Sequence, residues 1–140
     1  MNILLVCTGN TCRSPMAEGI LKAILPGHCV SSAGIMAQEG AGASENAIKS
    51  AMEKGIDISG HKARNLTKEL VLDADLILCM TQGHKSMIEG VKDKCFTLSE
   101  YAGKSGDVSD PFGKDIEEYR ACFAQLEELL GIIAEKIEGK

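Results

Sequence analysis

Cys7-Thr8-Gly9-Asn10-Thr11-Cys12-Arg13-Ser14-Pro15 is the stretch that decides the fold, because it joins an apolar run to the start of a helix. Residues 3–6 form that run, which is typical of a buried strand in a parallel sheet. Ser14 is a candidate helix N-cap, and Pro15 suits the first helical position. Main-chain N–H groups of such a loop converge near the positive end of the helix dipole. The stretch therefore predicts a loop that binds a phosphate or sulfate anion.

Cys7 and Arg13 add a nucleophile and an anion clamp to this loop. A helix N-terminus, a neighbouring arginine and hydroxyl donors all favour the thiolate form of a cysteine. The planar guanidinium of Arg13 can bind two oxygens of a phosphoryl group at once, which lysine cannot do equivalently. Gly9 permits backbone geometry closed to other residues. The alternative is that Cys7 is only a buried thiol on a strand.

Residues 7–18, CTGNTCRSPMAE, resemble the signature loop of the low-molecular-weight protein tyrosine phosphatases, which is Cys-x5-Arg-Ser near the N-terminus. The resemblance spans nearly the whole chain and continues in residues 32–34, 60–64, 74–81 and 110–113. It implies an α/β fold in which a four-stranded parallel sheet, in the order 2-1-3-4, has helices on both faces and the phosphate-binding loop after the first strand.

The resemblance also implies a mechanism. Cys7 attacks phosphorus to give a phosphocysteine, Arg13 binds the phosphoryl group, and Asp110 protonates the leaving group before activating water. The residues agree in part, because Asp110 follows a polar stretch, 103–109, that is typical of a surface loop able to approach a pocket, although Asp-Pro alone is more often a turn. Substrate binding is expected at Thr8, Gly9, Asn10, Thr11, Cys12, Ser14 and Phe112.

Two further roles rest on the same resemblance. His61 is expected to support the catalytic loop by hydrogen bonding to Asn10, the alternative being an exposed loop histidine. Cys12 is expected to form a reversible disulfide with Cys7 under oxidative stress, which would protect the nucleophile from irreversible oxidation. Packing of the loop is the alternative for Cys12.

Thr11 and Phe112 bear on which phosphorylated group is cleaved. Relatives that act on phosphotyrosine typically carry a bulky aliphatic residue in place of Thr11 and two aromatics after the proline, where this chain has Phe112 and Gly113. A hydroxyl can hydrogen-bond a guanidinium inside a pocket, whereas an aliphatic wall suits an aromatic ring. Together with Thr8 and residues 80–85, these features resemble the protein-arginine-phosphatase branch. The carboxylate of Asp110 would then also bind the cationic guanidinium.

Three other classes of function remain as alternatives. A tyrosine phosphatase would share the chemistry and differ in pocket shape. An arsenate reductase would need further cysteines to carry oxidation outward, and its usual closely spaced pair is absent, since Cys79 and Cys95 lie sixteen positions apart. A phosphate-binding module without catalysis would not need Cys7, Arg13 and Asp110 together.

Length and composition indicate one domain, residues 1–140, with 44% hydrophobic content. The net charge of −5 has no basic block, which argues against a nucleic-acid partner. No secretion signal or membrane-spanning run is found, so we expect a cytoplasmic monomer that acts on phosphorylated proteins. The six cysteines have no paired C-x2-C spacing, and we expect reduced thiols and neither metal nor cofactor. His28 and His84 are expected on the surface.

Hydrophobic periodicity alternates between strand and helix along the chain, which is typical of a doubly wound parallel sheet. Helices are predicted at 15–25, 45–54, 67–72 and from 81 to about 89, and strands at 30–33, 76–80 and 95–98. Ile35 and Met36 are candidates for a pocket wall, with ordinary packing as the alternative. The last helix has an apolar stripe that should pack on the sheet: Ile116, Tyr119, Phe123, Leu126, Leu130, Ile133 and Ile137.

Overall fold

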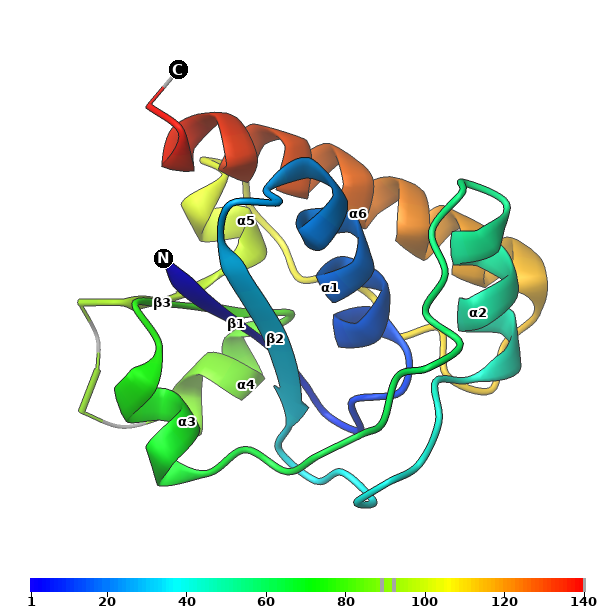
Figure 1. Ribbon diagram of the computed structural model, residues 1–140, viewed down its shortest axis with the longest axis horizontal. Helices are drawn as coiled ribbons and strands as arrows, with labels where there is room; N and C mark the ends of the chain where they lie inside the picture. Colours follow the sequence, from blue (N-terminus) through cyan, green and yellow to red (C-terminus); the bar gives the residue numbers. More distant parts are fainter. Residues whose placement is uncertain (89, 92, 140) are drawn as a thin grey trace.

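Four parallel strands form the centre of the computed structural model, which describes residues 1–88, 90–91 and 93–139 (Figure 1). They lie in the order β2-β1-β3-β4, and each neighbouring pair is parallel. The predicted strand order and direction are therefore confirmed. The strands are β1 (Asn2–Cys7), β2 (Cys29–Gly34), β3 (Leu76–Cys79) and β4 (Cys95–Thr97).

Helices cover both faces of this sheet (Figure 1). Ile3 and Leu5 of β1 point into the larger apolar cluster, which they share with α1 and α6, whereas Leu4 and Val6 point into a smaller cluster beside α3. This split follows from the alternation of side chains along a strand that is buried on both faces. The helices are α1 (Arg13–Ile24), α2 (Glu45–Met52), α3 (Lys68–Asp73), α4 (Gln82–Ser86), α5 (Leu98–Tyr101) and α6 (Ile116–Ile137).

The predicted stripe of the last helix is confirmed in α6, which packs along α1 (Figure 1). Phe123, Leu126, Leu130 and Ile133 are almost completely buried, and Ile116 and Ile137 pack partly buried against the same core. Asp115 begins the helix by accepting a hydrogen bond from the main chain of Glu118. Within the three described ranges, the structure contains no helix with the length and hydrophobicity needed to cross a membrane.

The start of α1 differs from the prediction. The helix begins at Arg13 after Cys12, which makes no side-chain capping bond, so Pro15 is the third helical residue and Ser14 the second. Ser14 is not the N-cap, because its hydroxyl is hydrogen-bonded to the thiol of Cys7 instead. The Ser14 hydroxyl, which could have capped the free N–H groups of the helix, thus contacts the catalytic loop.

Two short helices also differ from the prediction. The segment after β3 forms α4, which ends at Ser86 rather than near residue 89, and Glu89 itself lies outside the described residues. The sequence did not predict α5, a four-residue helix that follows β4 directly. Thr97 and Glu100 close a reciprocal capping box at its start, which stabilises so short a helix. The predicted helix near residue 67 is confirmed as α3, with Thr67 as its N-cap.

Candidate active site

Cys7 is the last residue of β1, and its thiol lies at the centre of the loop that leads into α1. The residue is almost fully buried. Its Sγ lies 2.8 Å from the Ser14 hydroxyl and 3.3 Å from the main-chain nitrogen of Asn10. The Ser14 hydroxyl and the Asn10 N–H can both donate a hydrogen bond to the sulfur, and α1 begins in the same loop. The geometry therefore suits a sulfur that acts as a nucleophile.

Asn10 holds the loop in shape. Its backbone has a φ of 56°, in the left-handed region that non-glycine residues adopt at a cost, and its side chain is completely buried. The amide nitrogen donates to Ser14 Oγ (2.8 Å) and Ser32 Oγ (2.9 Å), and the amide oxygen accepts from the main chain of Arg64 (3.0 Å). The main-chain carbonyl lies 2.7 Å from Nε2 of His61. These bonds from distant segments stabilise the strained backbone.

His61 thus contacts Asn10, as expected, through the main-chain carbonyl. Sequence reasoning missed the other partners. Ser32 donates to Glu18 Oε1 at 2.5 Å, and Nε of Arg64 donates to the main-chain oxygen of Ser32 at 3.0 Å. In the sequence, residues 32–34 and 60–64 contribute only to the family resemblance. The one signal there for a role at the loop is that these ranges contain polar side chains.

Gly34 brings the end of β2 against this loop. A Cβ atom at that position would lie 2.6 Å from the carbonyl oxygen of Thr8 and 3.0 Å from the nitrogen of Asn10. The main chains of Ile35 and Met36 donate to the carbonyls of Cys7 and Thr8, both at 2.9 Å. Only glycine permits so close an approach of the two backbones.

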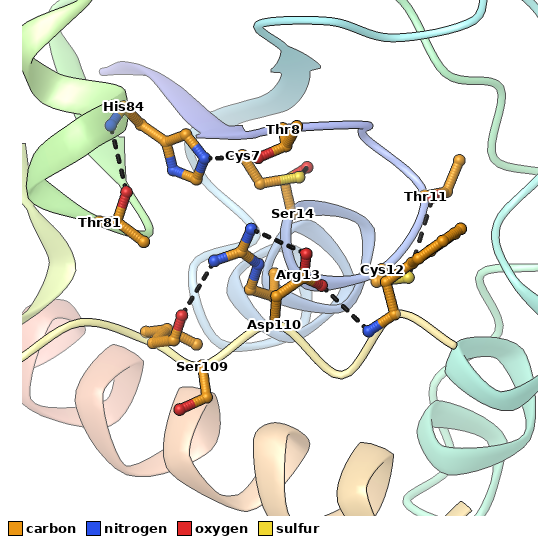
Figure 2. Close-up of polar contacts among 12 residues, drawn as sticks. Cys7, Thr8, Thr11, Cys12, Arg13, Ser14, Thr81, His84, Ser109 and Asp110 are labelled. Atoms are coloured by element: carbon orange, nitrogen blue, oxygen red, sulfur yellow. Dashed lines mark hydrogen bonds and ion pairs between the residues drawn. The ribbon is translucent and has the colours of Figure 1, made fainter. Parts of the chain in front are cut away.

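Arg13 connects the loop to the segment that carries Asp110 (Figure 2). The guanidinium is 95% buried, donates from Nη1 to the carbonyl of Val108 at 2.9 Å, and lies 3.5 Å from Oδ2 of Asp110 through Nη2. Asp110 itself is half exposed, and its Oδ1 accepts from the main chain of Phe112 at 3.1 Å. Residues that are 97 positions apart in the chain therefore meet at one place.

A cavity of about 180 Å³ opens at this meeting point. Ile35 and Met36 do not line it: the side chain of Met36 is 77% exposed, and Ile35 packs with the smaller apolar cluster on the other face of the sheet. The expectation for these two residues was therefore wrong. The cavity is lined by Cys7, Thr8, Gly9, Thr11, Cys12, Arg13, Asp110 and Phe112. A larger hollow of about 490 Å³ lies behind the loop and does not reach Cys7.

His84 was predicted on the surface, and the structure contradicts this. It is only 8% exposed, and its Nε2 lies 2.8 Å from the hydroxyl of Thr8 in the cavity wall (Figure 2). Burial, with the charge of Arg13, lowers its pKa below the ordinary value of 6.5. His28 is not fully exposed either, because it is half-buried and contacts the N-terminal amine at 3.0 Å. Reasoning from metal spacing alone missed both contacts.

The cysteines are free thiols, but two unexpected contacts involve them. Cys12 Sγ lies 3.3 Å from the hydroxyl of Tyr119, and burial raises the pKa of that phenol to about 12. Cys79 and Cys95 are distant in sequence, yet their sulfurs are 3.8 Å apart and buried. The contact with Cys95, together with burial, raises the pKa of Cys79.

The pair formed by Cys79 and Cys95 belongs to the smaller apolar cluster, on the sheet face opposite the cluster that contains Cys7. A direct thiol exchange between the pair and Cys7 is therefore blocked by the sheet, which weakens the arsenate-reductase alternative. Cys29 is exposed. No group of three or more histidine, cysteine or acidic side chains arranged to hold a metal ion occurs in the described part of the chain.

Comparison with known proteins adds to this geometry. Residues 2–140 match the family described as low molecular weight phosphotyrosine protein phosphatase. The chain is 49% identical to a protein-arginine-phosphatase of Geobacillus stearothermophilus, over 97% of this chain and 95% of that protein. It is 40% identical to the low molecular weight protein-tyrosine-phosphatase PtpB of Staphylococcus haemolyticus, over 94% and 96%.

The fold is also similar to that of a solved structure of the YwlE arginine phosphatase, a mutant with a phosphorylated active-site serine. The TM-score is 0.94 at 42% sequence identity, and the match covers 100% of this chain and 97% of that one. The predicted α/β architecture is therefore confirmed.

Proposed function

The chain belongs to the low molecular weight phosphotyrosine protein phosphatase family, and we propose that it is a protein arginine phosphatase that works through a phosphocysteine on Cys7. The observation that carries this proposal is the single cavity where the Cys7 thiol, the Arg13 guanidinium and the Asp110 carboxyl group converge. Residues 1–140 would form a single domain with one active site. The expected substrates are phosphorylated proteins.

In the first step, the Cys7 thiolate attacks phosphorus and the P–N bond to the guanidino group breaks. The protonated Asp110 carboxyl group gives its proton to the leaving nitrogen, so that no negative charge builds up on that nitrogen as the P–N bond breaks. Arg13 turns toward the phosphoryl oxygens and binds two of them in a fork, while loop N–H groups bind the third. The products of this step are a phosphocysteine and a free arginine side chain.

In the second step, the Asp110 carboxylate takes a proton from water as the water oxygen attacks phosphorus. The S–P bond breaks, inorganic phosphate leaves and the thiolate is restored. Ser14 and the main chain of Asn10 stabilise the sulfur both as nucleophile and as leaving group, because they already contact it at 2.8 and 3.3 Å. The same loop would bind phosphate or sulfate as a free anion.

Thr11 and Asp110 favour phosphoarginine over phosphotyrosine. Both line the cavity, so the oxygens of a hydroxyl and of a carboxyl group are available to accept hydrogen bonds from the N–H groups of a guanidinium. The likeness to a protein-arginine-phosphatase at 49% identity supports the same substrate. Phosphotyrosine is the second candidate, because the exposed ring of Phe112 lines the cavity and can pack on an aromatic substrate.

The deciding experiment measures kcat/KM on matched phosphoarginine and phosphotyrosine peptides, with Cys7→Ser as the blank. We expect a preference for phosphoarginine and no turnover by Cys7→Ser. A preference for phosphotyrosine would retain the cysteine mechanism and reject the assignment of the substrate. Turnover by Cys7→Ser would reject the mechanism.

We propose further that Cys7 and Cys12 form a disulfide when peroxide oxidises the site. One hydrogen peroxide takes up the two thiol hydrogens and two electrons and leaves as two waters, while the S–S bond forms. Intact-mass analysis after mild peroxide should show a loss of two hydrogens with loss of activity, reversed by a thiol reductant. Persistence of that mass loss in Cys12→Ser would assign the disulfide to another pair, such as Cys79 and Cys95.

A further inference from the structure

His84 lies in α4, at the carboxyl end of β3, and its ring reaches the catalytic loop from the side opposite Thr11 (Figure 2). Its Nε2 is 2.8 Å from the Thr8 hydroxyl, and its main-chain nitrogen donates to Thr81 at 3.1 Å. The neighbouring Gln82 donates from its main chain to Asp107 at 3.0 Å. The short helix α4 therefore touches both the Cys7 loop and the loop that carries Asp110.

The other ring nitrogen of His84, Nδ1, makes no hydrogen bond to any residue that the structure describes. This atom is also buried. A buried polar atom without a partner lowers stability, and native proteins contain few of them. An apolar ring of similar size would avoid this loss, so packing alone does not explain a histidine at this position.

Charged groups that face His84 determine its protonation. Arg13 approaches from α1 and disfavours a second positive charge, as does burial, while Asp107 and Asp110 act in the opposite direction from their loop. The balance lowers the pKa of His84, so the ring is neutral at neutral pH. An orphaned acceptor occurs more readily in proteins than an orphaned N–H donor. The favoured tautomer therefore has the proton on Nε2 and donates it to Thr8.

We propose that His84 is a positioning residue of the phosphatase site, because its neutral ring donates to the Thr8 oxygen and leaves the Thr8 O–H free to donate to the phosphorylated group. Thr8 lines the cavity beside Cys7 and Arg13, so a hydroxyl with a fixed direction there contacts what the cavity binds. The inference rests on the proposed function in that the cavity is taken as the substrate site. Without His84, the Thr8 hydroxyl rotates freely and makes this bond only part of the time.

A double-mutant cycle tests this inference. The variants are His84→Phe, Thr8→Val and the double mutant, with His84→Gln as the conservative control, because the Gln amide nitrogen can occupy the place of Nε2. Each is assayed for kcat and KM on a phosphoarginine peptide and on p-nitrophenyl phosphate, and for thermal unfolding. We expect His84→Phe and Thr8→Val each to lower kcat/KM by about tenfold, the upper range for one hydrogen bond.

The double mutant should lose no more than either single mutant, since both changes remove the same interaction. His84→Gln should stay within about threefold of wild type. His84→Phe should keep the melting temperature, because it removes the orphaned Nδ1. Losses that multiply in the double mutant, or a His84→Gln as impaired as His84→Phe, would overturn the proposal.

The second substrate separates this test from that of the proposed function. If wild type hydrolyses p-nitrophenyl phosphate but not the phosphoarginine peptide, the substrate assignment fails and the cycle on p-nitrophenyl phosphate still decides the role of His84. A fall in melting temperature that accounts for the loss of activity in His84→Phe would overturn the positioning role, because a purely structural histidine predicts that result.

Discussion

The two halves of the site are built differently. Around Cys7, the loop is buried, and the side-chain amide and main-chain carbonyl of Asn10 are bonded to distant segments. Asp110, in contrast, is half exposed and is held by Arg13 and by the main chain of Phe112. The first half is therefore fixed in the shape that binds an anion before any anion arrives. The second half has few contacts to lose when a substrate enters. Rigidity is concentrated where charge must be stabilised, and freedom where a leaving group must fit.

Removing the acid from the loosely held half should give the largest effect. Asp110→Asn keeps the shape of the side chain but cannot transfer a proton, so we expect kcat to fall by about 10²- to 10⁴-fold. Stability should change by less than about 0.5 kcal/mol, since the side chain is half exposed. Asp107→Asn, in the same loop, is the matched control and should remain near wild type in steady-state kinetics. Equal losses in both variants would show that the loop, not the proton, matters.

Breaking the rigid half should lower stability and activity together. In Asn10→Gly, the left-handed backbone is kept and the side-chain bonds are lost, and we expect the free energy of unfolding to fall by about 2–4 kcal/mol. Asn10→Ala loses the same bonds and adds about 1 kcal/mol of backbone strain. Urea denaturation of both variants measures this difference. If the Asn10→Ala and Asn10→Gly variants had the same free energy of unfolding, the backbone strain assigned to Asn10 would be absent.

The boundary between the halves should control the choice of substrate. Thr11→Ile replaces a hydroxyl in the cavity wall by an aliphatic surface, so we expect the ratio of kcat/KM for phosphoarginine over phosphotyrosine peptides to fall by about tenfold. Thr11→Ser keeps the hydroxyl and should keep the ratio. An unchanged ratio in Thr11→Ile would remove Thr11 from the specificity argument.

The smallest effect should appear in the pH dependence of stability. The folded-state pKa of His84 lies below its unfolded value near 6.5, so the unfolded chain binds the proton more tightly. The contribution of neutral His84 to the free energy of unfolding should therefore be fully present above about pH 6.5. It should decrease as the pH drops through this value and become constant below the folded-state pKa. Comparing thermal unfolding of wild type and His84→Gln between pH 5 and 8 isolates the contribution. A contribution that grows toward low pH would reverse the assigned direction.

The sequence predicted the elements that depend on local pattern. The strand before Cys7 and the apolar stripe of α6 are confirmed, because hydrophobic periodicity is visible within short windows. The strand order is also confirmed, but it was implied by the family resemblance and not by local pattern. The bonds between Asn10 and residues 32, 61 and 64 were predicted only at His61, since they form between segments that meet only after folding. The prediction of Ser14 as the N-cap was wrong, because the pattern of a helix start does not include the thiol of Cys7, which is hydrogen-bonded to the Ser14 hydroxyl.

His84 shows the same limit from another side. A histidine without metal-ligand spacing is ordinarily exposed, and its contact with Thr8 joins residues that are 76 positions apart. The meeting of Arg13 and Asp110 was anticipated only through the family resemblance. For these residues, the missing information was the path of the chain around the sheet.

The close approach of Gly34 to the Cys7 loop also has a consequence for the order of folding. The loop cannot take its final shape until β2 has docked beside β1 and residues 61–64 have been drawn in, because its bonds end on those segments. We therefore expect the anion site to form late, after contacts between distant parts of the chain are made. A partly folded chain would contain Cys7 without the folded loop around it, so reactivity toward phosphate esters would report that folding is complete.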